Sequence, residues 1–200
     1  MAIYTPDHFV SRDQPAALKL IHDHPFATLI TSVPGEELQI TYIPMLYEDG
    51  ALFGHVARPN PHWQKFGKGS TVALFHGPHA FVSPRWYEKP EDNVPTWNYA
   101  VVHVHGCPEL LEVSRKRPHL EQLFARMSDG DTLPTDPAKV ERLLGGIVAF
   151  RMPVARFEIK FKMNQNKSAA DRAGVIQGLR ASGFAGSIAT ADWMQAHESP

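Results

Sequence analysis

The chain has 200 residues, of which 43% are hydrophobic and 20% charged, enough to bury a sizeable core. Its formal net charge of −1 gives no overall attraction to nucleic acid or to an anionic membrane. The single cysteine, Cys107, excludes an intrachain disulfide framework and is expected to be a small buried side chain. The first residues do not resemble a signal peptide, and no apolar run reaches membrane-spanning length. We therefore expect a soluble cytoplasmic protein.

Predicted helices lie towards the two ends of the chain, and predicted strands lie mostly between them. A helix is expected after the capping sequence Ser11–Gln14 and before Pro25, and another begins at Ser168. Apolar residues at helical spacing predict a further helix over 120–127. Strands are predicted over 26–33, 38–44, 51–56, 71–76, 97–113 and 147–161. Short strands without regular intervening helices favour an antiparallel barrel over a doubly wound sheet.

The segment from His55 to Trp63 carries the densest polar chemistry of the chain. It follows a predicted strand, and its two prolines together with Asn60 predict a turn. Arg58 in this turn would present donors to an anion, and phosphate is a natural guest because a guanidinium matches its oxygens. The alternative is an ordinary polar loop with one exposed arginine.

Two further clusters could contribute to a binding site. The aromatic residues Trp86, Tyr87, Trp97 and Tyr99 could form a wall for a flat ligand, with Asn98 supplying hydrogen bonds. The alternatives are a plug in the core or an aromatic dimer interface. The second cluster, residues 160–167, has three lysines and three side-chain amides that could close over a phosphate or a ring edge. A solvated strand end is the competing interpretation.

The common signatures of catalytic and nucleotide-binding sites are absent from the sequence. There is no Gly-x-Gly-x-x-Gly, Walker loop, His-Glu-x-x-His, Cys-x-x-Cys or Gly-x-Ser-x-Gly. Eleven histidines are present, and His103 and His105 would share one side of a strand. Further ligands at readable spacing are missing, so we expect no dedicated metal site and instead hydrogen-bonded histidines.

Five motifs in their order along the chain resemble those of the FMN-binding negative transcriptional regulators of bacteria, the PaiB type. The resemblance extends from about residue 1 to 190 and rests on Phe9 with His24–Phe26, and on residues 54–63, 77–87, 94–99 and 162–167. This family often has serine at the position of Asn164 and arginine at that of Lys167. The lysine would weaken a bidentate phosphate contact there.

The resemblance implies an antiparallel split β-barrel with flanking helices, similar to pyridoxamine-phosphate oxidase, which binds FMN at the interface of a homodimer. We expect residues 1–165 to form this FMN-binding domain and residues 166–200 to form a helical extension packed on it. The resemblance also implies three groups of cofactor-binding residues, one at the phosphate, one along the ring system and one from the facing subunit. These are His55, Arg58 and Asn60; Thr41, Tyr42, Ile43 and Pro44; and Trp97, Asn98, Lys162 and Gln165.

The resemblance implies negative transcriptional regulation, which we expect to work through a flavin redox or ligand signal passed to a partner. Direct binding to DNA is weakly supported, because no helix-turn-helix pattern is evident. The only basic run, Arg115–Arg117, is expected to start a solvated helix before Pro118. An FMN-dependent oxidoreductase and a haem-binding or haem-processing split barrel are the alternative functions.

Overall fold

The structure is a computed structural model in which residues 3–197 are described. These residues divide into two compact units. Unit 1 comprises residues 3–20, 76–102 and 158–197, and unit 2 comprises residues 21–75 and 103–157. The chain passes between the units within α1 (Gln14–Asp23), β5 (Ser70–Val82), β6 (Thr96–Gly106) and β8 (Ile147–Lys162). The expected division into residues 1–165 and 166–200 stays a prediction.

The described strands form one eight-stranded sheet. Its order is β2-β1-β5-β6-β8-β4-β3, with β7 paired to β8 outside this path. The strand pairs within unit 2 are antiparallel, as expected from short strands joined by turns. The strands not yet delimited are β1 (Phe26–Ser32), β2 (Gln39–Pro44), β3 (Leu46–Glu48), β4 (Ala51–Ala57) and β7 (Glu109–Leu110).

The β1–β2 pair of unit 2 has one buried and one exposed face. Ala27 and Leu29 of β1 are buried, and they alternate with more exposed residues, as the period of a half-buried strand predicts. On β2 the side chain of Ile43 is buried, whereas Ile40 and Tyr42 remain exposed. The following β3–β4 turn is formed by Asp49 and Gly50, both with left-handed φ angles, of 47° and 77°, which suits a tight hairpin.

The two helices of unit 2 differ from the sequence-based expectation. Helix α2 (Val113–Met127) continues through Pro118, so the basic run lies inside it, and Lys116 is buried instead of solvated. Helix α3 (Pro137–Gly145) was not predicted. It begins with proline, and the Asp136 side chain accepts a hydrogen bond from the Ala138 amide at 3.0 Å.

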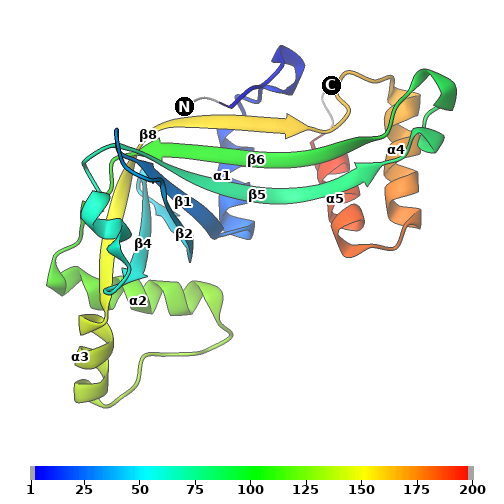
Figure 1. Cartoon of the computed structure of the whole chain (residues 1–200). Helices are drawn as coiled ribbons and strands as arrows, with labels where there is room; N and C mark the ends of the chain where they lie inside the picture. Colours follow the sequence, from blue (N-terminus) through cyan, green and yellow to red (C-terminus); the bar gives the residue numbers. More distant parts are fainter. Residues whose placement is uncertain (1–2, 198–200) are drawn as a thin grey trace. The chain divides into compact units, whose positions relative to one another are not determined.

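Unit 1 contains the C-terminal helices α4 (Ala169–Ala181) and α5 (Ala185–Ala196), which pack side by side in Figure 1. The cap at Ser168 is confirmed, since Ser168 accepts from the Asp171 amide at 3.0 Å. At the start of α1 the cap is Asp13, which accepts from the Ala16 amide at 2.9 Å, and not the Ser11 of the predicted capping box. Helix α5 was not predicted. The short 3-10 helices are η1 (Asp7–Phe9), η2 (Pro61–Lys65), η3 (Pro84–Trp86) and η4 (Pro90–Asp92).

The structure also corrects the expected environments of Cys107 and of one aromatic residue. Strand β6 ends at Gly106, where an added Cβ would lie 2.3 Å from the Pro153 carbonyl oxygen. The chain leaves the sheet there, so Cys107 is exposed. The indole of Trp86 lies against Gly178 of α4, where an added Cβ would be 2.3 Å from the ring. Trp86 therefore belongs to the packing of unit 1, which was the alternative to a ligand-binding wall.

Among the described residues, none of the helices combines the length and the apolar character that a membrane crossing requires.

Candidate functional site

The turn after β4 is held in place by its own backbone and by its neighbours in unit 2. The amide of Arg58 donates to the carbonyl of Gly146 at 2.8 Å, and the amide of Asn60 donates to that of Ala57 at 2.9 Å. The indole N–H of Trp63 donates to the Arg58 carbonyl at 3.2 Å. The chain therefore passes from β4 to η2 along a fixed path.

Asn60 connects this turn to β2. Its side-chain oxygen accepts a hydrogen bond from the amide of His62 at 3.0 Å and so caps η2. Its Nδ2 donates to Thr41 Oγ1 at 3.2 Å. The structure thus brings together Thr41 and Asn60, two of the residues predicted to bind the cofactor.

His62 continues this network into the interior of unit 2. Its Nδ1 lies 2.8 Å from Thr41 Oγ1, and its Nε2 lies 2.9 Å from Thr31 Oγ1. Thr31 Oγ1 is in turn 2.9 Å from Thr71 Oγ1. Burial lowers the pKa of His62 from 6.5 to about 4, because a charged imidazole would lose its hydration there. At neutral pH His62 is therefore uncharged.

Arg58 points away from this network. Its Nε donates to the Gly145 carbonyl at 2.6 Å, and its Nη2 donates to the Ile147 carbonyl at 3.3 Å. A guanidinium has five N–H groups, so three remain for a ligand. Arg58 is exposed and forms no ion pair with a carboxylate of the described residues. It therefore fits an anion such as the phosphate of FMN.

A hollow of about 500 Å³ lies beside Arg58. Lys116 and Arg117 of α2 and Glu141 of α3 also line it. Lys116 is buried, and its Nζ donates to the carbonyls of Leu144 at 3.1 Å and Ile147 at 3.0 Å. Burial, and to a lesser degree the neighbouring Arg58, lower the pKa of Lys116. The hollow thus presents three cationic side chains and one carboxylate next to the turn.

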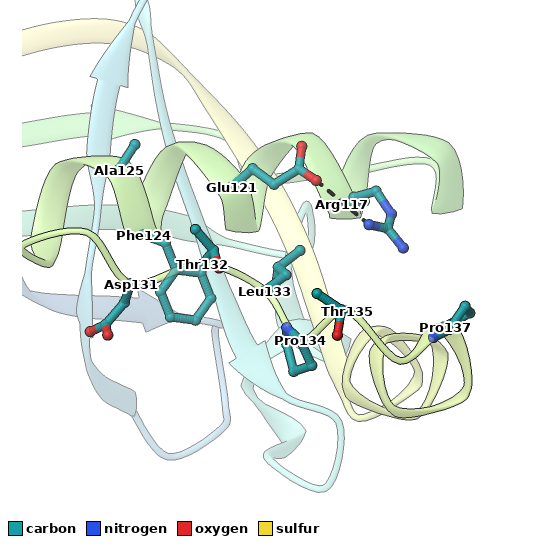
Figure 2. A pocket seen from close by; sticks show the side chains of 10 residues that line it. All are labelled: Arg117, Glu121, Phe124, Ala125, Asp131, Thr132, Leu133, Pro134, Thr135 and Pro137. Carbon is teal, nitrogen blue, oxygen red and sulfur yellow. Dashed lines mark ion pairs between the residues drawn. The ribbon is translucent and has the colours of Figure 1, made fainter.

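A second hollow of unit 2, of about 530 Å³, lies between α2 and the segment that leads to α3 (Figure 2). It shares Arg117 and Pro137 with the first hollow. Figure 2 shows Phe124, Leu133 and Pro134 along one part and an Arg117–Glu121 ion pair of 3.6 Å at another. Arg117 and its ion pair belong to both hollows, but the first hollow also has Arg58 and Lys116, so the second hollow is the poorer anion site.

His55 forms a pair with a histidine that the sequence did not single out. Its Nδ1 lies 3.1 Å from Nε2 of His119 on α2. Burial lowers the pKa of both imidazoles, and that of His119 falls to about 4, with His55 adding a smaller repulsion. Nδ1 of His119 is buried without a hydrogen-bond partner within the described part of the chain. At neutral pH this pair offers no positive charge to a phosphate.

The other three β2 residues predicted to line the flavin lie in different environments. Tyr42 is 64% exposed, and Ile43 is buried under Gly54, where its Cδ1 lies 3.3 Å from an added Cβ. Pro44 ends the strand opposite Phe26 of β1. A ligand lying along this strand would therefore meet Tyr42 and backbone groups more readily than the side chain of Ile43.

In unit 1, Lys162 joins β8 to β6. Its Nζ donates to Thr96 Oγ1 and to the carbonyl of Trp97, both at 2.7 Å. Burial and the neighbouring Lys160 lower the pKa of Lys162. Trp97 is itself 48% exposed, and its ring stacks on His79 with the centroids 6.1 Å apart. Lys162 therefore contacts the backbone of Trp97, and the half-exposed indole of Trp97 stacks on His79 of the neighbouring strand β5.

The side chains of Gln165 and Asn98 already make contacts within unit 1. Gln165 accepts from the Met163 amide at 2.7 Å through Oε1 and donates to the Phe161 carbonyl through Nε2, which folds the chain after β8. Asn98 is fully buried, and its Nδ2 lies 3.4 Å from the sulfur of Met194. Its Oδ1 has no hydrogen-bond partner within residues 3–197. A direct contact of the Asn98 side chain with a ligand would require a rearrangement of this packing.

Sequence reasoning missed His62, His119, Lys116, Thr31 and Thr71 as polar members of the interior. His62 lies inside the 55–63 motif, but the sequence of this motif does not indicate which of its side chains point into the interior. A signal existed for Lys116, because it lies four residues before Leu120 on the apolar side of α2.

The chain is similar to several known proteins. Residues 3–156 match the family described as "Putative FMN-binding domain". The chain is 29% identical over 188 residues to "Protease synthase and sporulation protein PAI 2" of Bacillus subtilis, with 89% of each chain covered. It is 26% identical over 224 residues to an uncharacterised protein of Aspergillus fumigatus, covering 82% of this chain and 86% of that one.

Two solved structures have a similar fold at low sequence identity. The FAD and haem binding protein of Mycobacterium smegmatis is 14% identical with a TM-score of 0.63, covering 82% of this chain and 78% of that one. The flavocytochrome Anf3 of Azotobacter vinelandii is 14% identical with a TM-score of 0.62, covering 82% and 75%. With the antiparallel sheet, these likenesses confirm the split-barrel fold.

Proposed function

The chain belongs to the FMN-binding domain family, and from this premise we propose that the turn after β4 holds the phosphate of its FMN cofactor. One observation carries the proposal. The Arg58 guanidinium is exposed, fixed by two backbone carbonyls, and retains three N–H groups without a carboxylate partner in the described part of unit 2. Asn60 also retains one side-chain N–H, and His55 lies three residues earlier on β4.

The ring system of FMN is proposed to lie along β2, from Thr41 to Pro44. Exposed Tyr42 and the backbone of this strand would contact it. Trp97, Asn98, Lys162 and Gln165 are proposed to act from the facing subunit, where exposed Trp97 and the fixed Lys162 are the best supported. When bound, the flavin would supply one- or two-electron redox chemistry, and the protein would bind and orient it.

A homodimer is supported by an apolar surface of unit 2. On β2 and just before it, Leu38, Ile40 and Tyr42 are exposed, by 51%, 50% and 64%, and Phe26 of β1 by 64%. Ile40 and Tyr42 lie opposite Ile30 and Thr28 of β1, so this is one face of the two strands. A continuous apolar face of this kind is typical of an interface. Its position on β2 would put the flavin beside the partner subunit.

We propose that the protein is a negative transcriptional regulator that acts indirectly, through a flavin redox or ligand signal passed to a partner protein. Two features argue against tight binding to DNA by this chain alone. The net charge is −1, and burial of Lys116 leaves only Arg115 and Arg117 of the basic run exposed. The similarity to the protein named "Protease synthase and sporulation protein PAI 2" supports a regulatory role.

An FMN-dependent oxidoreductase is the second candidate function. The structures with a similar fold include proteins named for FAD, haem and a flavocytochrome, so this fold carries redox cofactors elsewhere. Turnover of a reduced nicotinamide by the flavin-loaded protein would favour the enzyme. A haem-dependent Soret band would favour the haem-binding alternative.

The absorption spectrum of the purified protein, followed by titration with FMN and riboflavin, tests the proposed cofactor site. We expect flavin absorbance, one FMN for each chain, and weaker binding of riboflavin because riboflavin lacks the phosphate. Equal affinity for the two flavins would contradict a phosphate site at Arg58.

A further inference from the structure

We propose that His62 is a positioning residue for the FMN phosphate, whose buried imidazole fixes the side chains of Asn60 and Thr41 at the turn after β4. The inference rests on the proposed function, because it concerns how that site is held in shape. It adds a residue that would not touch the cofactor and a chain of hydrogen bonds that leads from the site into the interior.

The chain of hydrogen bonds joins three parts of unit 2. It runs from Asn60 in the turn to Thr41 on β2, then to His62 in η2, and on to Thr31 on β1 and Thr71 on β5. Its inner members are almost completely inaccessible: 1% of His62, none of Thr31 and 3% of Thr71 are exposed. Buried polar groups without water depend on one another for hydrogen bonds, so a change at one member affects the others.

The directions of these hydrogen bonds follow from one fixed donor. The amide of His62 can only donate, so the atom of Asn60 that faces it must be the amide oxygen. The NH₂ group of Asn60 then donates to Thr41 Oγ1, and the hydroxyl hydrogen of Thr41 is free to be donated to Nδ1 of His62. In the proposed network the Thr41 hydroxyl donates to Nδ1, so that His62 carries its proton on Nε2 and donates it to Thr31 Oγ1.

This arrangement determines what the site can offer a ligand. The oxygen and the nitrogen of the Asn60 side-chain amide each form a hydrogen bond, so the second N–H of this amide points in one fixed direction. Thr41 is held from two sides, by Asn60 and by His62, at the strand proposed to carry the ring. Without the imidazole, the Thr41 hydroxyl would lose its buried partner and Asn60 would lose a fixed acceptor. Such pre-organisation strengthens binding because less side-chain freedom is lost when the ligand arrives.

The test compares FMN with riboflavin in the full-length protein carrying His62→Phe, which keeps an aromatic ring beside Phe66 but has no polar atoms. Fluorescence titration is expected to show at least about tenfold weaker FMN binding, the size of one lost charge-assisted contact, with riboflavin changed by less than about twofold. His62→Gln should recover part of the FMN affinity, since its amide can accept from Thr41 and donate to Thr31.

Leu52→Ala is the matched control for stability. Leu52 is fully buried on β4 of the same unit and belongs to no part of the network. It should lower the unfolding midpoint while leaving the ratio of FMN to riboflavin affinity at its wild-type value. A role of His62 in stability alone would give the same result for His62→Phe, and that outcome would overturn the proposal.

Two further measurements keep the proposal open to disproof if His62→Phe does not fold. Thr31→Val removes the acceptor of the Nε2 proton at the far end, and it should lower the FMN-to-riboflavin ratio in the same direction. ¹⁵N NMR of the imidazole in the flavin-free protein should show the neutral tautomer with the proton on Nε2. The opposite tautomer, or an unchanged ratio in Thr31→Val, would overturn the proposal. Failure of the proposed phosphate site is recognised separately, because wild-type protein itself would then bind both flavins equally.

Discussion

Arg58 and Lys116 donate hydrogen bonds to the same carbonyl oxygen, that of Ile147, at 3.3 and 3.0 Å. Each also donates to a carbonyl at the end of α3, Arg58 to Gly145 and Lys116 to Leu144. The C-terminal carbonyls of a helix carry partial negative charge, which stabilises two cations that would otherwise repel each other. The turn proposed to hold the phosphate is thereby attached to α3.

Arg58→Ala is expected to weaken FMN binding about ten- to hundredfold, because it removes a charge-assisted and possible bidentate contact worth about 1.5–3 kcal/mol. Arg58→Lys should recover only part of the affinity, since an ammonium cannot reproduce the guanidinium fork. Flavin fluorescence titration measures both variants, and riboflavin should discriminate poorly between wild type and Arg58→Ala.

Arg58→Ala is also expected to lower the free energy of unfolding slightly. The Arg58 side chain donates to the carbonyls of Gly145 at the end of α3 and Ile147 at the start of β8, and such bonds contribute about 1 kcal/mol each, less where exposed. Urea unfolding should show a small decrease. Equal FMN affinity in two folded proteins, wild type and Arg58→Ala, would remove this residue from the site.

Lys116→Met is expected to reduce the free energy of unfolding by about 1–2 kcal/mol, because it leaves the half-buried Leu144 carbonyl without its donor. Methionine retains the apolar stem, so lost packing contributes little. Lys139→Met, at an exposed position of α3, serves as the control and should change stability by less than about 0.5 kcal/mol. Similar urea midpoints for the two variants would show that the buried ammonium contributes nothing.

The protein is expected to lose stability in mildly acidic solution. His62 and His119 have pKa values lowered by burial to about 4, against 6.5 when unfolded. Between these values the unfolded chain binds more protons, so stability is fully present above about pH 6.5 and falls as the pH approaches 4. The loss is on the order of 3 kcal/mol for each histidine at most. Urea unfolding at pH 7, 6 and 5 measures it.

Replacing either histidine by glutamine separates its contribution to this pH dependence. His62→Gln and His119→Gln should each flatten the decline between pH 6.5 and 4, although both lower stability at neutral pH. A decline as steep as that of the wild type in both variants would mean that other groups cause the acid sensitivity.

Ile40→Asp is expected to convert the proposed homodimer into a monomer and to weaken FMN binding. Ile40 is 50% exposed within the apolar face of β1 and β2, and a carboxylate there would have to be buried without a partner. Leu110→Asp, at a residue of β7 that is 51% exposed, is the matched control. Light scattering after size exclusion measures both. A stable wild-type monomer at micromolar concentration would contradict the interface.

The isolated protein is expected to bind random duplex DNA only weakly at physiological salt, since the net charge is −1. Electrophoretic shift and footprinting with promoter fragments measure this. Nanomolar affinity with protection of defined bases would instead support a direct regulator.

Local sequence signals determined much of the secondary structure. The capping residues Asp13 and Ser168, the Asp49–Gly50 turn and the alternating residues of β1 and β2 each act within a few positions of the chain. These short-range preferences were sufficient to predict an antiparallel sheet. They also located the turn with Arg58 and Asn60, because proline and asparagine restrict the backbone independently of distant contacts.

Only the tertiary structure decided which polar residues are buried. Lys116 was predicted to be solvated, yet the carbonyls of Leu144 in α3 and Ile147 in β8, which lie 28 and 31 residues away, offer it partners. Arg58 and His62 belong to one short motif, but one is exposed and the other is 1% exposed. A turn has no long periodicity from which inward and outward positions can be read. The hydroxyls that form hydrogen bonds with the His62 imidazole belong to Thr31 of β1 and Thr41 of β2. Only the tertiary structure brings these two strands next to His62.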